Sequence, residues 1–127
     1  KNESFVFLDW RQDFAGHIGV GDLYYDLAKL LHGIIVNHGI ITKNHYSVNW
    51  TSNRIDFDLH RTQILVECER LFYCWIRKSN FDIKKVKVIT GLIFLNIACL
   101  HHFPYALLLF ALGRFLLNEE VQDQKWI

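Results

Sequence analysis

The long, mostly apolar stretch from Leu92 to Leu117 is the feature that most limits how this chain can fold. Its length would allow one helix to span a bilayer. In that case His101, His102 and Pro104 would lie near the middle of the membrane, and Arg114 would also be buried in hydrocarbon. Each half of the stretch has the length of a buried core helix. We therefore expect two antiparallel core helices and no membrane span, with a membrane-embedded hairpin as the less favoured alternative.

Helical spacing of apolar residues predicts the remaining helices. The first runs from about Asp22 to His38, because leucine and isoleucine recur every three or four positions and Asp22 is a good N-cap. Gly39 is the expected terminator. A second helix is predicted over residues 59–78 and ends at Ser79-Asn80.

The third and fourth helices divide the long apolar stretch. Asp82 is expected to cap the third, which runs to about His102. Pro104 then begins the last helix, Tyr105 to Leu117, since proline is tolerated in a first turn. Residues 118–127 are predicted to be a polar tail that is either disordered or held by Trp126.

Two segments have the patterns of β-strands. Ser4 to Trp10 is short and apolar, which predicts a buried strand at the N-terminus. Residues 46–59 alternate between apolar and polar side chains on both sides of Thr51-Ser52-Asn53, which predicts a small hairpin. The expected fold class is therefore mainly α, with a short strand and a hairpin.

Composition narrows the classes of function. The chain has 127 residues, of which 51% are hydrophobic, enough for the core of one modest domain. Its net charge is +1 and its lysines and arginines are scattered, so we expect no nucleic-acid partner. The cysteines Cys68, Cys74 and Cys99 lie in apolar helical stretches, which predicts small buried thiols in a reducing, cytoplasmic setting.

The histidines and cysteines show neither the spacing of a metal site nor the arrangement of a catalytic nucleophile with its base. His32 and His38 are six positions apart, so one helical face would not present both, and His101 and His102 are adjacent. We expect no zinc site, and we interpret the histidines as satisfied residues at the surface or at helix ends. The aromatic residues Trp10, Tyr24, Tyr25 and Trp50 could line a ligand pocket, although a core would use the same residues.

Two short motifs lie near the N-terminus. The first is Leu8-Asp9, at the end of the predicted strand. The second is Gly21-Asp22-Leu23-Tyr24-Tyr25-Asp26-Leu27-Ala28, which opens the first predicted helix. As a spaced pair they resemble the motifs of the aminoglycoside phosphotransferase and choline kinase family, the small-molecule branch of the protein-kinase-like fold. The closest resemblance is to bacterial members linked to surface-polysaccharide biosynthesis. It implies that the chain is the distal part of the C-terminal lobe of a kinase-like fold.

The resemblance assigns roles to three aspartates. Asp9 corresponds to the acid that holds Mg²⁺ against the phosphates of ATP. Without the motif, an aspartate that closes a strand would more often cap a turn; Asp13 is a less favoured alternative ligand. Asp22 and Asp26 correspond to residues that support the site and brace the catalytic loop. No catalytic residue and no nucleotide-binding residue is identified in this chain.

The family's glycine-rich loop, phosphate-binding lysine and His-Gly-Asp-x-x-x-x-Asn loop precede the metal acid, whereas only eight residues precede Asp9 here. We therefore expect residues 1–127 to be a single partial domain, inactive alone, whose partner is the missing N-terminal part of the same protein. An apolar surface left exposed by that part would favour a homo-oligomer.

The expected function is transfer of the γ-phosphoryl group of ATP to a hydroxyl of a small molecule, such as a sugar, choline or an aminoglycoside. The alternative is a non-catalytic helical interaction module that retains the kinase-like scaffold.

Overall fold

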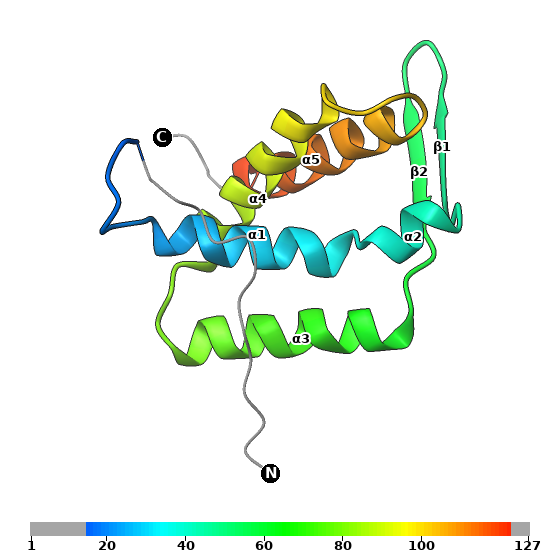
Figure 1. Ribbon diagram of the computed structural model, residues 1–127. Helices are drawn as coiled ribbons and strands as arrows, with labels where there is room; N and C mark the ends of the chain where they lie inside the picture. The colour runs from blue at the N-terminus through cyan, green and yellow to red at the C-terminus, as the bar shows by residue number, and fades with distance from the viewer. Residues whose placement is uncertain (1–14, 123–127) are drawn as a thin grey trace.

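The computed structural model describes residues 15–122, which form a mainly helical structure with one two-stranded antiparallel sheet (Figure 1). The predicted mainly α class and the hairpin are confirmed, and the kinase-like lobe stays a prediction. The predicted strand at Ser4 to Trp10 lies outside the described residues. No helix of the described part has both the length and the apolar character that a bilayer crossing requires. In chain order the elements are α1 (Leu23–Ile35), α2 (His38–Thr42), β1 (Tyr46–Trp50), β2 (Ile55–Leu59), α3 (Gln63–Lys78), α4 (Ile83–Ala98) and α5 (Tyr105–Gln122).

Helices α4 and α5 form the centre of the core, running side by side in opposite directions (Figure 1). Their backbones approach closely at Gly91 and Gly113. A Cβ atom on Gly113 would lie 2.8 Å from the carbonyl oxygen of Gly91 and 2.8 Å from Cγ of Leu95. Because no side chain fits in that space, glycine permits a helix spacing that any other residue would widen.

Helix α1 packs on α4 through its buried face. Leu27, Ala28 and Leu31 are all buried there. Thr90 of α4 is fully buried, and its hydroxyl oxygen lies 2.8 Å from the carbonyl oxygen of Val86 and 3.3 Å from that of Ala28. The hydroxyl is therefore satisfied by backbone acceptors, so it can sit in the interface between two helices without a desolvation penalty.

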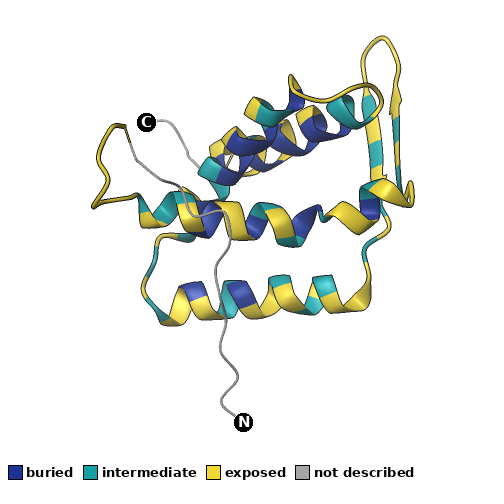
Figure 2. Cartoon of the chain, viewed as in Figure 1, coloured by how far each residue is buried: buried dark blue, intermediate teal, exposed yellow. Residues whose placement is uncertain are grey.

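Helix α3 is joined to α1 by Arg61, which lies in the connection between β2 and α3. Its Nη1 donates to Oε2 of Glu69 at 2.6 Å. Its Nη2 lies 3.2 Å from the carbonyl oxygen of Ile34 and 3.3 Å from that of Leu65. The guanidinium therefore binds the C-terminal turn of α1 and the first turns of α3 together. Apart from Phe72 and Ile76, which are buried, most of α3 is exposed, and much of its ribbon is yellow in Figure 2.

The hairpin packs one face against α5. Val48 lies opposite Phe57 in the register, and both are half-buried. The ring of Phe57 lies 6.2 Å from that of Phe115, and the ring of Tyr46 lies 6.1 Å from that of Tyr105. The alternating pattern in the sequence therefore reflects one face on the helices and one in solvent.

The end of the first predicted helix is wrong by a few residues. Helix α1 ends at Ile35, where Val36 adopts an extended backbone, and the side chain of Asn37 accepts a hydrogen bond from the amide of Ile40 at 2.9 Å. Asn37 thereby caps the separate short helix α2, which contains Gly39. The asparagine cap, and not the glycine, separates the two helices.

Other boundaries also differ from the predictions. Helix α3 begins at Gln63 because Leu59 is still paired in β2, and α4 ends at Ala98, where the turns tighten to i→i−3 hydrogen bonds. Helix α5 continues to Gln122, five residues into the predicted polar tail; residues 123–127 lie outside the described part.

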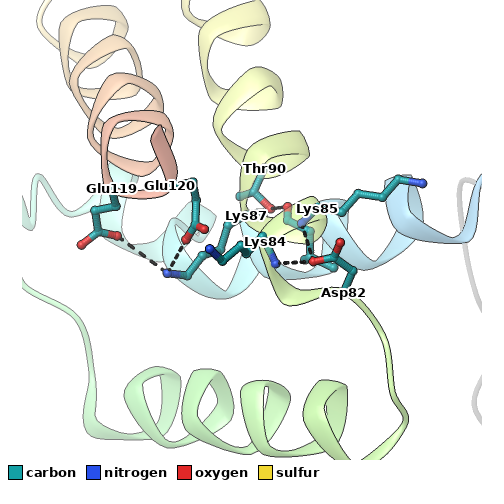
Figure 3. A network of polar contacts seen from close by, with 8 residues as sticks. Asp82, Lys84, Lys85, Lys87, Thr90, Glu119 and Glu120 are labelled. Atoms are coloured by element: carbon teal, nitrogen blue, oxygen red, sulfur yellow. Dashed lines mark hydrogen bonds and ion pairs between the residues drawn. The ribbon is translucent and has the colours of Figure 1, made fainter. Parts of the chain in front are cut away.

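A buried ion pair explains why α5 continues so far (Figure 3). Glu120 is 7% exposed, and its Oε1 lies 2.9 Å from Nζ of Lys87 on α4. Glu119 approaches the same ammonium at 3.9 Å. The remaining oxygen of Glu120 is buried without a partner among the described residues. The last turn of α5 is thus held to α4 by charge as well as by apolar packing.

Two helical glycines, one crowded and one with free space around it, provide a test of the close approach between α4 and α5. We expect Gly113→Ala to lower the free energy of unfolding by about 1–3 kcal/mol, because the added methyl group meets the Gly91 carbonyl and Leu95. Gly33→Ala in α1 is the matched control, since a Cβ there meets nothing within 4 Å. It should raise stability by about 0.5–1 kcal/mol through helix propensity. Urea unfolding measures both; equal changes in the two variants would contradict the close approach.

Removing one partner of the ion pair provides a second test. We expect Lys87→Met to destabilise the fold by about 2–3 kcal/mol, because Glu120 is left buried without its counter-charge; the 25% exposure of Lys87 moderates the loss. The double variant Lys87→Met/Glu120→Leu should recover at least half of that loss. Lys84→Met, at an exposed position of the same helix, is the control and should change stability by less than about 0.5 kcal/mol. A double variant no more stable than Lys87→Met would refute the pairing.

Candidate functional site

The motif from Gly21 to Ala28 forms the N-cap and first turns of α1. The side chain of Asp22 accepts a hydrogen bond from the amide of Tyr24 at 2.9 Å, as predicted for an N-cap. Leu27 and Ala28, at the end of the motif, are buried against the core. The motif therefore has two parts: a polar beginning at the exposed end of α1 and an apolar end that fixes the helix in the core.

Asp26 lies one turn after Asp22 and is exposed. Among the described residues its carboxylate has neither a hydrogen bond nor an ion pair, whereas that of Asp22 is engaged in the cap. Of these two motif carboxylates, Asp26 is therefore the one whose oxygens can accept hydrogen bonds from another segment. Its predicted bracing role remains a prediction.

Tyr24 connects the beginning of α1 to the beginning of α4. Its hydroxyl oxygen accepts a hydrogen bond from the amide of Asp82 at 3.2 Å, and its ring packs edge-on against Phe81. The ammonium of Lys85 lies 4.0 Å from the centre of the same ring, in cation–π geometry. The predicted cap of α4 is confirmed, because Asp82 accepts from the amides of Lys84 and Lys85, as Figure 3 shows. Tyr24 is thus a structural residue.

The aromatic residues considered for a ligand pocket do not come together within the described part. Tyr24 and Tyr25 lie in the first turn of α1, whereas Trp50 lies at the end of β1, next to the hairpin turn and on the opposite side of the view in Figure 1. Trp50 is 67% exposed. Trp10 lies outside the described residues.

The predicted metal ligand Asp9 and its alternative Asp13 also lie outside the described residues. From residue 15 to residue 122, no three side chains of histidine, cysteine, aspartate or glutamate are grouped so that they could hold a metal ion.

His32 lies in the last turn of α1, at a helix end as expected, but it is not the satisfied histidine that was expected. It lies in α1 with its ring 4.7 Å from that of Phe94, and its Nε2 is buried without a partner in the described part. Burial, and to a smaller extent the charge of Lys29, lowers the pKa of His32 from 6.5 to about 4. The folded protein therefore holds this imidazole neutral.

An open apolar groove between α1 and α3 is the feature that sequence reasoning missed. Its volume is about 410 Å³. Helix α3 contributes two neighbouring apolar stripes, of which the stripe through Phe72 and Ile76 is buried and the stripe through Leu71 and Trp75 is not. This double stripe is the signal in the sequence. The groove is lined by Leu27, Leu30, Ile34, Cys68, Leu71, Phe72 and Trp75.

The cysteines differ from their prediction as well. Cys68 and Cys99 are exposed and Cys74 is half-buried, so they are not the small buried residues that were expected. All three thiols are free. Cys68 lies in the wall of the groove, whereas Cys99 caps the C-terminus of α4.

Comparisons with models of protein families, with curated proteins and with solved structures find no match. Between residues 15 and 122 the structure has a capped helix start, the exposed carboxylate of Asp26 and an apolar groove.

The buried imidazole of His32 gives a pH test. Between pH 6.5 and about 4, His32 is protonated in the unfolded chain but neutral in the folded chain. The free energy of unfolding therefore falls as the pH is lowered through this window. One pKa unit corresponds to about 1.4 kcal/mol, and partial solvent screening of this half-buried ring reduces the total to about 1–2 kcal/mol.

We expect His32→Gln to lose this part of the pH dependence, with exposed His102→Gln as the control that retains it. Urea unfolding at several pH values between 4 and 6.5 measures the effect. Parallel curves for the parent and His32→Gln would contradict the buried neutral state.

Proposed function

We propose that this chain is part of an ATP- and Mg²⁺-dependent phosphotransferase that acts on a hydroxyl of a small molecule. The observation that carries the proposal is the pair of motifs, Leu8-Asp9 and Gly21 to Ala28, at the spacing that resembles the family. The position of the second motif supports it, because Asp22 caps α1 and Leu27 and Ala28 anchor that helix in the core. A helix fixed in this way gives a rigid support for a site at its beginning.

In this proposal the residues of the chain bind and position; they do not abstract the proton. Asp9 contributes a carboxylate ligand to Mg²⁺, which when bound neutralises charge on the phosphates of ATP. Asp26, exposed and unengaged within residues 15–122, accepts hydrogen bonds from the catalytic loop. Tyr24 and Asp82 hold the beginning of α1 against α4, so that Asp26 stays at a fixed position.

The reaction forms a bond between the acceptor oxygen and the γ-phosphorus and breaks the bond from that phosphorus to the β–γ bridging oxygen. ADP leaves, and the hydroxyl proton passes to a base in the catalytic loop, which lies in the N-terminal part of the same protein. The acceptor class is an alcohol of a sugar, choline or an aminoglycoside. We place this enzyme in the cytoplasm, where ATP is available and free thiols such as Cys68 and Cys99 remain reduced.

Substitution of Asp9 tests the proposal in the full-length protein. We expect Asp9→Asn to lower kcat at least about a thousandfold, because the lost group is a metal ligand, while the melting temperature stays unchanged. Asp13→Asn is the matched control, an aspartate of the same segment without a counterpart in the motif, and should keep kcat within about threefold. Formation of phosphorylated product from a hexose, choline and an aminoglycoside is the measurement. Near-normal turnover by Asp9→Asn would exclude the metal assignment.

The open apolar groove favours a second candidate, a non-catalytic module that binds another polypeptide segment. The two functions differ in nucleotide binding. Calorimetry of the full-length protein with ATP and Mg²⁺ should give a binding isotherm if it is a phosphotransferase and none if it is a module.

A further inference from the structure

The groove between α1 and α3 keeps large apolar side chains in solvent. Leu30 is 54% exposed, Leu71 is 57% exposed and Trp75 is 48% exposed, although all three line a concave surface. No charged side chain is among its lining residues. A concave apolar surface of this kind usually marks a place where another apolar segment packs.

The two helices are fixed at both ends of this groove, so they do not close over it. At one end Arg61 joins the last turn of α1 to the beginning of α3. At the other end the ring of Phe81 lies 6.1 Å from that of Tyr24 in α1 and 5.6 Å from that of Trp75 in α3. Because both ends are braced, an additional segment must fill the groove if its apolar surface is to be buried.

We propose that residues Phe5 to Trp10 of this chain occupy the groove. This segment is the apolar part of the chain that precedes the described residues, and Asp9 is its one charged residue. In an extended conformation Val6, Leu8 and Trp10 share one face, because alternate side chains point to opposite sides of a strand. That face is entirely apolar and matches the lining of the groove in chemistry.

The length of the chain allows this placement. The described part begins at the end of the molecule where α1 starts (Figure 1). Leu8 lies seven positions before Ala15, and seven positions span roughly 23 Å when the chain is extended. Helix α1 is roughly 20 Å long. The segment can therefore reach any point of the groove.

Tethering favours this segment over a second copy of the chain. A second copy would lose translational and rotational freedom on binding, at a cost of at least about 4 kcal/mol. A segment joined to the groove through a short linker has an effective concentration in the millimolar range. At micromolar protein the intramolecular occupant prevails. In the same extended conformation Asp9 would fall on the face opposite to Val6, Leu8 and Trp10, so its carboxylate would remain outside the groove. The placement depends on no step of phosphoryl transfer.

The thiol of Cys68 is a natural probe of the groove, and Cys99 is an internal control outside it. We expect iodoacetamide to modify Cys68 in the complete chain at least about tenfold more slowly than Cys99, each rate being normalised to the urea-unfolded chain. Peptide mass spectrometry resolves the two sites. Because both thiols are exposed in the described part, protection of Cys68 alone requires an occupant of the groove.

Two variants identify that occupant. Leu8→Asp should raise the rate at Cys68 to that at Cys99, because a carboxylate is costly in an apolar groove. Asn2→Asp adds the same charge outside Phe5 to Trp10 and should leave the protection intact. Leu71→Gln changes the groove instead of the segment that occupies it, and it should also reduce the protection of Cys68. Circular dichroism should show unchanged helix content in all three variants.

Three results would overturn the proposal. Equal rates at Cys68 and Cys99 in the parent chain at micromolar concentration would show an open groove. Protection that survives Leu8→Asp and increases with protein concentration would identify a second copy as the occupant. Protection that survives Leu8→Asp at every concentration would assign the groove to another part of the chain. These readouts use no nucleotide, so they are independent of the kinase assay.

Discussion

The close approach of α4 and α5 at Gly91 and Gly113 is the constraint on which the other packing depends. With the two backbones in contact, Leu95 and Leu117 pack directly over the neighbouring glycine. The same spacing brings Lys87 within 2.9 Å of Glu120 at the other helix. Helix α1 then packs on the resulting pair, with the hydroxyl of Thr90 satisfied by the carbonyl oxygens of Val86 and Ala28. A wider separation would disturb the ion pair and the surface on which α1 rests.

The fold positions the candidate site by fixing one helix and leaving its surroundings open. Helix α1 is buried through Leu27, Ala28 and Leu31 but begins at an exposed end, where Asp26 is available. Along its other side lies the apolar groove toward α3. Both features can accommodate additional polypeptide: the carboxylate can accept hydrogen bonds and the groove can take an apolar segment. This is why the phosphotransferase and the docking of Phe5 to Trp10 are compatible, although each has its own evidence.

The sequence allowed the elements to be predicted well where local chemistry determines them. Asp22 and Asp82 were identified as caps because a carboxylate before a helical run binds free amides, and the hairpin was visible from its alternation. The predictions were wrong where contacts between residues far apart in the sequence determine the structure. The extension of α5 depends on Lys87, which is far from Glu120 in the sequence, and the buried state of His32 depends on Phe94. At the candidate site, the capping pattern at Asp22 predicted where α1 begins, whereas the roles of Asp9, Asp22 and Asp26 in a phosphotransferase stay predictions. The groove was missed because the sequence of α3 contains two apolar stripes. Only the packing of α3 determines which of them is buried and which lines the groove.

Arg61 makes one position responsible for three connections. Its Nη1 donates to the carboxylate of Glu69, and its Nη2 donates to the carbonyl oxygens of Ile34 and Leu65. A lysine at this position would present all of its donors from a single nitrogen, which cannot lie between partners spread around the fork. The positive charge alone is therefore not enough here. Loss of the guanidinium would weaken the contacts of Arg61 with the last turn of α1 and with the first turn of α3. A substitution at this one loop residue would therefore affect both helices that line the groove.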